Sequence, residues 1–186
     1  MNPLLAAAAN VQALLDQNGW RHSIIGGLAV LRWGEPRLTR DVDLTVLVTP
    51  ATEDSLIRLL LSAPRRGRIS DADAFARRNR VLLLLSEEGV PLDIALGALN
   101  FESEMIERST LFEFAPGCLL RTCSAEDLMV QKLFAFRDRD KADASSIAVR
   151  QRSNLDWPAV EHRLRPLAEL KEQPEIMKFL AALRRQ

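Results

Sequence analysis

Polar and apolar residues alternate over residues 41–46, and two further apolar residues follow at 47 and 48. In an extended strand, successive side chains point to opposite faces, so one face would be polar and the other apolar. The polar positions are Asp41, Asp43 and Thr45, and the apolar positions are Val42, Leu44, Val46 and Val48. The pattern therefore predicts a strand that packs one face in a core and begins with two carboxylates on the other.

The rest of the chain follows helical and strand periodicities. Helical patterns occur at 3–17, 28–33, 49–63 and 125–137, and from there to the end with a break near Pro174. Thr49 or Thr52 would begin the helix at 49–63, and Ser124 with Asp127 would cap the helix at 125–137. Strand patterns occur at 22–25, at 80–85 and 90–97 around the turn "SEEG", and at 111–122 as a hairpin around Pro116 and Gly117. This order predicts an α+β (mixed α/β) fold, with a core at 1–122 and a helical region at 123–186 packed on it as one compact unit.

Composition narrows the class of protein. The 186 residues are 47% apolar and 27% charged, and no segment approaches the roughly 20 apolar residues of a membrane span. We expect a cytoplasmic protein with no membrane partner and with two reduced cysteines. Lys and Arg number 25, as do Asp and Glu, which argues against nucleic-acid binding by bulk charge. Arginines do cluster at 65–68 and 77–80, as a solvated loop or a nucleic-acid contact.

Three carboxylates share the same strand context. In the segment 90–97, Leu92, Ile94 and Leu96 face one way, and Asp93 faces the other. Asp41 and Asp43 would repel each other unless a cation lies between them or one takes up a proton, and a divalent cation is the usual solution. Asp71 and Asp73 share the spacing, but "SDADAFARR" has no strand pattern, and Asp71 is better explained as a helix cap.

Gly26 and Gly27 stand between a predicted strand and a predicted helix. Such a turn offers free backbone N–H groups to an anion. Glycine pairs also occur at tight turns for steric reasons alone.

Lys132 has an unusual position for a charged residue, because it lies among core positions of its helix. A nucleotide phosphate, an ion pair with Asp140 or Asp143, or snorkelling of the side chain would each satisfy it.

The segment "GGLAVLRWGEPRLTRDVDLTV" resembles the signature of bacterial minimal nucleotidyltransferases of the DNA polymerase β-like superfamily, in particular the AbiEii-like toxin and abortive-infection group. A Gly-Gly pair is followed in that signature by Arg-x-Thr-x-Asp-[Ile/Val]-Asp, and a third acid follows on a later strand. The matching residues are Gly26, Gly27, Arg37, Thr39, Asp41, Asp43 and Asp93. The later segment "LMVQKLFAFRDRDKADASSI" matches more loosely through Lys132, Arg139 and Asp143, and it has Ser146 where the family leads us to expect an acid.

The resemblance implies an enzyme that transfers a nucleoside monophosphate from a nucleoside triphosphate, such as ATP, to an acceptor hydroxyl on RNA, protein or a small molecule. It implies that two Mg²⁺ or Mn²⁺ ions bind Asp41, Asp43 and Asp93, with Asp93 as metal ligand or general base. The nucleotide-binding set that it implies is Gly26, Gly27, Arg37, Thr39, Lys132 and Asp143, with Lys132 also catalytic. It further implies an acceptor such as tRNA or a protein, an acceptor pocket largely in the helical region, and an antitoxin partner.

Two alternatives remain at this level. One is a catalytically degenerate module on the same fold that binds a nucleotide or a protein partner. The other is a metal-dependent phosphohydrolase, whose usual signatures place histidines near the acids, whereas this chain contains only His22 and His162. Trp20, Trp33 and Trp157 are interpreted as core or interface anchors rather than base-stacking residues.

Overall fold

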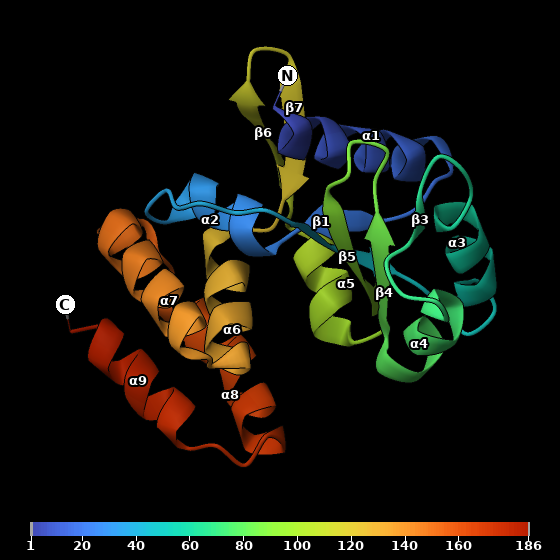
Figure 1. Cartoon of the computed structure of the whole chain (residues 1–186). Coiled ribbons are helices and arrows are strands. Elements are labelled where there is room, and N and C mark those ends of the chain that lie inside the picture. The colour runs from blue at the N-terminus through green and yellow to red at the C-terminus, as the bar shows by residue number, and fades with distance from the viewer. Residues whose placement is uncertain (1, 186) are drawn as a thin grey trace. The chain divides into compact units, whose positions relative to one another are not determined.

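The structure is a computed structural model that describes residues 2–185 (Figure 1). The chain divides into two compact units. The first contains the residues up to Leu28 together with Leu38–Cys123, and the second contains Ala29–Arg37 together with the residues from Ser124 onward. The chain thus passes between the units after Leu28, after Arg37 and after Cys123.

The first unit is built on a mixed sheet with seven strands among the described residues. These are β1 (His22–Ile24), β2 (Val42–Leu47), β3 (Arg66–Gly67), β4 (Val81–Leu85), β5 (Pro91–Gly97), β6 (Thr110–Ala115) and β7 (Cys118–Thr122). Their spatial order is β3-β4-β5-β2-β1-β7-β6. β2 runs parallel to β5 and antiparallel to β1, so the two strands that carry the predicted acids are direct neighbours at the centre of the sheet.

Helices of the first unit pack on this sheet. They are α1 (Pro3–Gln17), α3 (Glu53–Leu60), α4 (Ala72–Asn79) and α5 (Asn100–Glu107). α1 packs against β7 and β2, and α5 packs against β1 and β2. The core is formed by the apolar side of each strand, where Val42, Leu44, Leu92 and Ile94 are completely buried. Burial of these side chains fixes the register, because a slip by one residue would exchange them with the acids.

The second unit is helical. Its helices are the end of α2 (Gly26–Trp33), which begins in the first unit, then α6 (Ala125–Ala135), α7 (Asp138–Gln151), the 3₁₀ turn η1 (Arg152–Asn154), α8 (Trp157–Leu170) and α9 (Glu175–Leu183). α6 is the central helix, because it contacts α7, α8 and α9 (Figure 1). Ser124 caps α6 by accepting the Asp127 N–H at 3.1 Å, as the sequence predicts.

The mixed α+β class is confirmed by this architecture. The strands predicted around the "SEEG" turn, the hairpin at Pro116 and Gly117, and the break near Pro174 are all present. α5 and the two-residue β3 were not predicted. The helix expected over 49–63 is shorter, at Glu53–Leu60, and neither Thr52 nor Asp71 caps its helix through a side-chain hydrogen bond. Within residues 2–185, no helix has the length and apolar character needed to cross a bilayer.

Candidate active site

The three predicted acids belong to the first unit, and the sheet brings two of them together. Asp43 on β2 and Asp93 on β5 are register partners in the parallel pair. Neighbouring strands lie about 4.8 Å apart, so these carboxylates project side by side from one face. Asp41 directly precedes β2 and is two residues from Asp43, so it shares that face. All three are partly exposed, in contrast to the fully buried Val42 and Leu44 between and beside them.

Gly26 and Gly27 lie against the acids, and the reason is steric. Gly26 has φ +58°, and a Cβ at this position would lie 1.9 Å from Asp43 Oδ2. A Cβ on Gly27 would lie 2.2 Å from Thr39 Oγ1. The Gly27 N–H also donates to Asp43 Oδ2 at 3.4 Å. Any larger residue would therefore displace either a predicted metal ligand or the threonine beside it.

Thr39 orients the first acid. Its side-chain hydroxyl donates to Asp41 Oδ1 at 3.0 Å, and Thr39 itself is buried beside Gly27. Because a buried hydroxyl restricts the carboxylate that it contacts, Asp41 has a defined direction before any ligand binds. The hydrogen bond between Thr39 and Asp41 is thus formed within the Thr-x-Asp-x-Asp segment itself, in the first unit.

Sequence reasoning missed one residue of this site. Arg68 Nη2 lies 2.7 Å from Asp93 Oδ1, and both side chains are about one-third exposed (32% and 31%). The sequence places Arg68 in the arginine cluster at 65–68, which predicts either a solvated loop or a nucleic-acid contact. The 24 residues between the partners carry no local signal of the contact, because the contact depends on how β3, β4 and β5 pair.

The donor set fits a divalent cation in its chemistry. Asp41, Asp43 and Asp93 supply only carboxylate oxygens, which are the ligands that Mg²⁺ and Mn²⁺ prefer. Their arrangement is less complete. Among residues 2–185, no three His, Cys, Asp or Glu side chains are gathered closely enough to surround one ion. Asp41 and Asp43 are hydrogen-bonded to Thr39 and Gly27, and Asp93 is paired with Arg68.

The predicted residues Arg37, Lys132 and Asp143 lie together in the second unit. With Asp140 and Arg137, which was not predicted, they form what we call the ion-pair cluster, whereas Arg139 is exposed. Lys132 Nζ lies 2.8 Å from Asp143 Oδ2 and 3.2 Å from Asp140 Oδ1. Arg37 donates two hydrogen bonds to Asp143, at 2.6 and 2.8 Å. Lys132, Asp140 and Asp143 are all buried. Of the partners that the sequence left open for Lys132, both aspartates are present.

The two aspartates of the ion-pair cluster are held ionised. Burial by itself raises the pKa of Asp143, but hydrogen bonds from Arg37 and Lys132, together with their charges, outweigh it and place that pKa below its usual range. The pKa of Asp140 is lowered against the same burial effect by hydrogen bonds and charges from Arg137 and Lys132. Each buried carboxylate therefore has two cationic partners, which is the condition for burying charge at acceptable cost.

Ser146 replaces the acid that the family signature would place here, and its contacts are structural. Its hydroxyl donates to the Asp143 carbonyl at 2.8 Å and accepts the Glu35 N–H at 3.2 Å. A Cβ on Gly34 would lie 2.6 Å from the Ser146 hydroxyl oxygen. Ser146 thus joins the loop after α2 to α7 within the second unit, and its hydroxyl fills the space that a side chain at position 34 would need.

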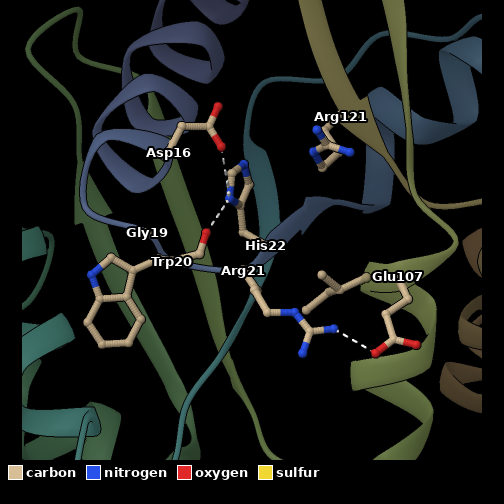
Figure 2. Close-up of a pocket in the computed structure, with 8 residues that line it drawn as sticks. Asp16, Gly19, Trp20, Arg21, His22, Glu107 and Arg121 are labelled. Carbon is tan, nitrogen blue, oxygen red and sulfur yellow. Dashed lines mark hydrogen bonds and ion pairs between the residues drawn. The ribbon is translucent and has the colours of Figure 1, made fainter.

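A cavity of about 290 Å³ lies beside the start of β1, where Trp20 and His22 are found (Figure 2). His22 Nδ1 lies 3.0 Å from the Trp20 carbonyl oxygen, and Arg21 forms an ion pair with Glu107 at 2.8 Å. Gly26 follows the other end of β1, so this cavity and the three acids are at opposite ends of that strand. Neither Trp20 nor His22 belongs to the acidic site, the name we use for Asp41, Asp43 and Asp93.

One known protein family matches most of this chain. The profile of one family, described as "Nucleotidyl transferase AbiEii toxin, Type IV TA system", matches residues 23–150. No curated protein matches the chain at a significant level.

Two solved structures are similar to this chain over most of its length. An antigenic nucleotidyltransferase-like protein from Paracoccidioides brasiliensis is similar with a TM-score of 0.51 and 18% identity, over 97% of this chain and 93% of that one. The structure of ANT(2″)-Ia in complex with adenylyl-2″-tobramycin has a TM-score of 0.49 and 18% identity, over 97% and 96%. At this level of identity, the first similarity shows the shared fold alone.

Proposed function

Because the chain belongs to the AbiEii nucleotidyltransferase family, we propose that it transfers a nucleoside monophosphate from a nucleoside triphosphate to an acceptor hydroxyl with the help of Mg²⁺. The observation that carries the proposal is the register of Asp43 with Asp93 on neighbouring strands, with Gly26 packed against Asp43 so closely that no side chain fits. A purely structural sheet has no need of adjacent carboxylates on its exposed face, because like charges there destabilise the pair.

In the proposed reaction, the acceptor oxygen forms a bond to the α-phosphorus, the bond between the α-phosphorus and its bridging oxygen breaks, and pyrophosphate leaves. Asp41, Asp43 and Asp93 are the residues that would hold Mg²⁺, which when bound neutralises the charge of the triphosphate. Asp93 is also suited to accept the proton of the attacking hydroxyl. Thr39 keeps Asp41 oriented for this task through its 3.0 Å hydrogen bond.

The remaining residues of the proposal act on the nucleotide. Gly26 and Gly27 are assigned to the phosphates because they begin α2, and the N-terminus of a helix offers backbone N–H groups to an anion. In the second unit, the ion-pair cluster carries three cations, Arg37, Lys132 and Arg137, against two carboxylates. We assign Arg37 and Lys132 to the triphosphate oxygens and Asp143 to orienting both, because Asp143 contacts each of them.

We propose that the acceptor is an RNA such as tRNA, or a protein, as the family resemblance implies. The helical unit has a cavity of about 680 Å³ whose lining includes Glu35, Ser145, Ser146 and Val149. We propose this cavity as the acceptor pocket. The family description, a type IV toxin–antitoxin system, suggests an antitoxin partner, and we further propose that the protein acts in the cytoplasm.

The test is transfer of label from each of the four α-³²P nucleoside triphosphates, with Mg²⁺ or Mn²⁺, to total RNA and to cell protein. Asp41→Asn should lower transfer by more than about a hundredfold, since loss of even a group that supports a metal ligand costs 10–100-fold. Asp73→Asn is the matched control, because Asp73 has the same Asp-x-Asp spacing but lies exposed in the first turn of α4. It should keep full activity.

Equal labelling by wild type and Asp41→Asn would contradict the assignment of the site. If no label is transferred and calorimetry shows no Asp41-dependent nucleotide binding, the protein is instead a binding module on this fold.

A further inference from the structure

The sheet places Arg68 in a row with two of the predicted acids. The Arg68 N–H donates to the Leu83 carbonyl at 2.9 Å, which continues the β3–β4 pairing by one residue. Leu83 is the register partner of Asp93, and Asp93 is the register partner of Asp43. Four consecutive strands thus align Arg68, Leu83, Asp93 and Asp43 across the sheet, and the contact of Arg68 with Asp93 follows from that pairing.

The contact is electrostatic rather than directional. Arg68 Nη2 is 2.7 Å from Asp93 Oδ1, yet this buried oxygen accepts no well-aligned hydrogen bond. Within residues 2–185, this is the one ion pair of either residue. Attraction between charges without aligned hydrogen bonding is easily exchanged for another partner of the same sign, in particular where about a third of each side chain is exposed.

Arg68 therefore occupies the carboxylate that the proposed metal site needs. A divalent cation bound by Asp93 would lie beside the guanidinium, and the two positive charges would repel each other. The pairing of Asp93 with Arg68 is consistent with the finding that, within residues 2–185, no three acids are gathered around one point.

We propose that Arg68 is a positioning residue that holds Asp93 in the metal-free protein and competes with the divalent cation for it. This inference rests on the proposed function, because it assumes that Asp93 is a metal ligand. Metal binding then requires the guanidinium to leave Asp93, and a phosphate group of the nucleotide is the anion that can receive it. The pair thereby disfavours loading of the metal alone and favours loading together with the nucleotide.

The experiment measures binding of Mn²⁺ to the whole protein without nucleotide, by the electron paramagnetic resonance signal of free Mn²⁺. Arg68→Gln should bind Mn²⁺ about two- to fivefold more tightly than wild type, the effect expected from losing one partly exposed ion pair. Arg68→Lys should stay near wild type because it keeps the charge. Arg66→Gln is the matched control, since Arg66 is an exposed arginine at the start of β3, two residues before Arg68, and its replacement removes the same bulk charge.

A double variant isolates the contact. In an Asp93→Asn background, Arg68→Gln should leave Mn²⁺ affinity unchanged, because the carboxylate for which the cations compete is gone. Unchanged or weaker Mn²⁺ binding by Arg68→Gln, with normal thermal unfolding, would overturn the inference. The same holds if Arg66→Gln has an equal effect.

Failure of the proposed function would give a different result from failure of the role proposed for Arg68. If wild type and all variants bind no Mn²⁺, both the metal site and the role of Arg68 are wrong. If Mn²⁺ binds and Arg68→Gln does not alter it, the metal site stands and only the role of Arg68 is overturned. Transfer of label reports the reaction itself and is measured separately.

Discussion

The acidic site of the first unit and the ion-pair cluster of the second treat charge in opposite ways. Asp41, Asp43 and Asp93 place like charges on one face of the sheet, where Arg68 contacts Asp93. In the ion-pair cluster, each buried carboxylate has two cations within ion-pair distance.

The difference separates a stabilising arrangement from a functional one. Buried charges that are fully paired can be explained by the fold itself. Partly exposed charges of one sign, with neighbouring glycines that leave no room for a Cβ, oppose stability and need a ligand as their explanation. On this criterion, the first unit has the stronger claim to catalysis, and the cluster of the second unit combines a structural role with the proposed one.

The largest expected effect concerns the ion-pair cluster. Lys132→Met should lower the free energy of unfolding by about 3–5 kcal/mol, because it leaves two buried carboxylates each short of a partner. Urea denaturation measures it. Lys178→Met is the matched control, since Lys178 is exposed on α9, and it should change stability by less than about 0.5 kcal/mol. Equal effects of both variants would remove the contrast between the two regions.

Gly26→Ala comes next and tests the packing at the acidic site. We expect a loss of about 2–4 kcal/mol in unfolding free energy, from the positive φ and from a Cβ 1.9 Å from Asp43 Oδ2. Gly89→Ala provides the comparison, because Gly89 has φ +76° but nothing within 4 Å of the added Cβ. It should lose only the backbone part, about 1 kcal/mol. A Gly26 variant as stable as the Gly89 variant would show that the acids are not held against this turn.

Acid should destabilise the ion-pair cluster. The folded pKa values of Asp140 and Asp143 are lowered, so their contribution to stability is fully present above the unfolded pKa of about 3.9 and is lost as pH falls through the folded values. The midpoint of urea unfolding, measured from pH 6 down to pH 3, should fall more steeply for wild type than for Asp143→Asn. Parallel curves would mean that Asp143 contributes no pH-dependent stability.

The smallest effect has the opposite sign. Asp41→Asn should leave the free energy of unfolding unchanged or raise it by roughly 0.5 kcal/mol, because one of several like charges is removed while the amide oxygen can still accept from Thr39. Thermal unfolding at low ionic strength measures it. A clear loss of stability would indicate that Asp41 is a structural residue, and the distinction drawn between the two regions would fail.

Much of this arrangement could be predicted from local patterns. The alternation around Asp41, Asp43 and Asp93 identified the faces of two strands, and the family signature linked these strands to the glycine pair. Neither pattern could reveal that the strands are direct neighbours in register, because pairing between β2 and β5 joins residues 50 positions apart. Position along the chain does not encode such pairing.

Other features could not be predicted from the sequence, for physical reasons. α5 has only Met105 and Ile106 buried, so its helical periodicity is weak. It is stabilised instead by Glu102, which accepts the N–H groups of Ala98 and Leu99 at 2.8 and 2.9 Å. β3 is too short to show alternation, and its existence is needed to bring Arg68 to Asp93. Lys132 was correctly identified as a lysine in a core, but the choice among its partners required the structure.

The path of the chain between the two units has a consequence for dissecting this protein. Residues 29–37 belong to the helical unit although they precede most of the sheet in sequence, and their partners, such as Asp143 for Arg37 and Ser146 for the Glu35 N–H, are more than 100 residues away. A single cut after Cys123 would therefore leave residues 29–37 on the N-terminal fragment, although their partners are on the C-terminal fragment. Neither half could be expressed as an intact folding unit, whereas a circular permutant or a two-chain complementation system would keep every partner and could be used to study each unit.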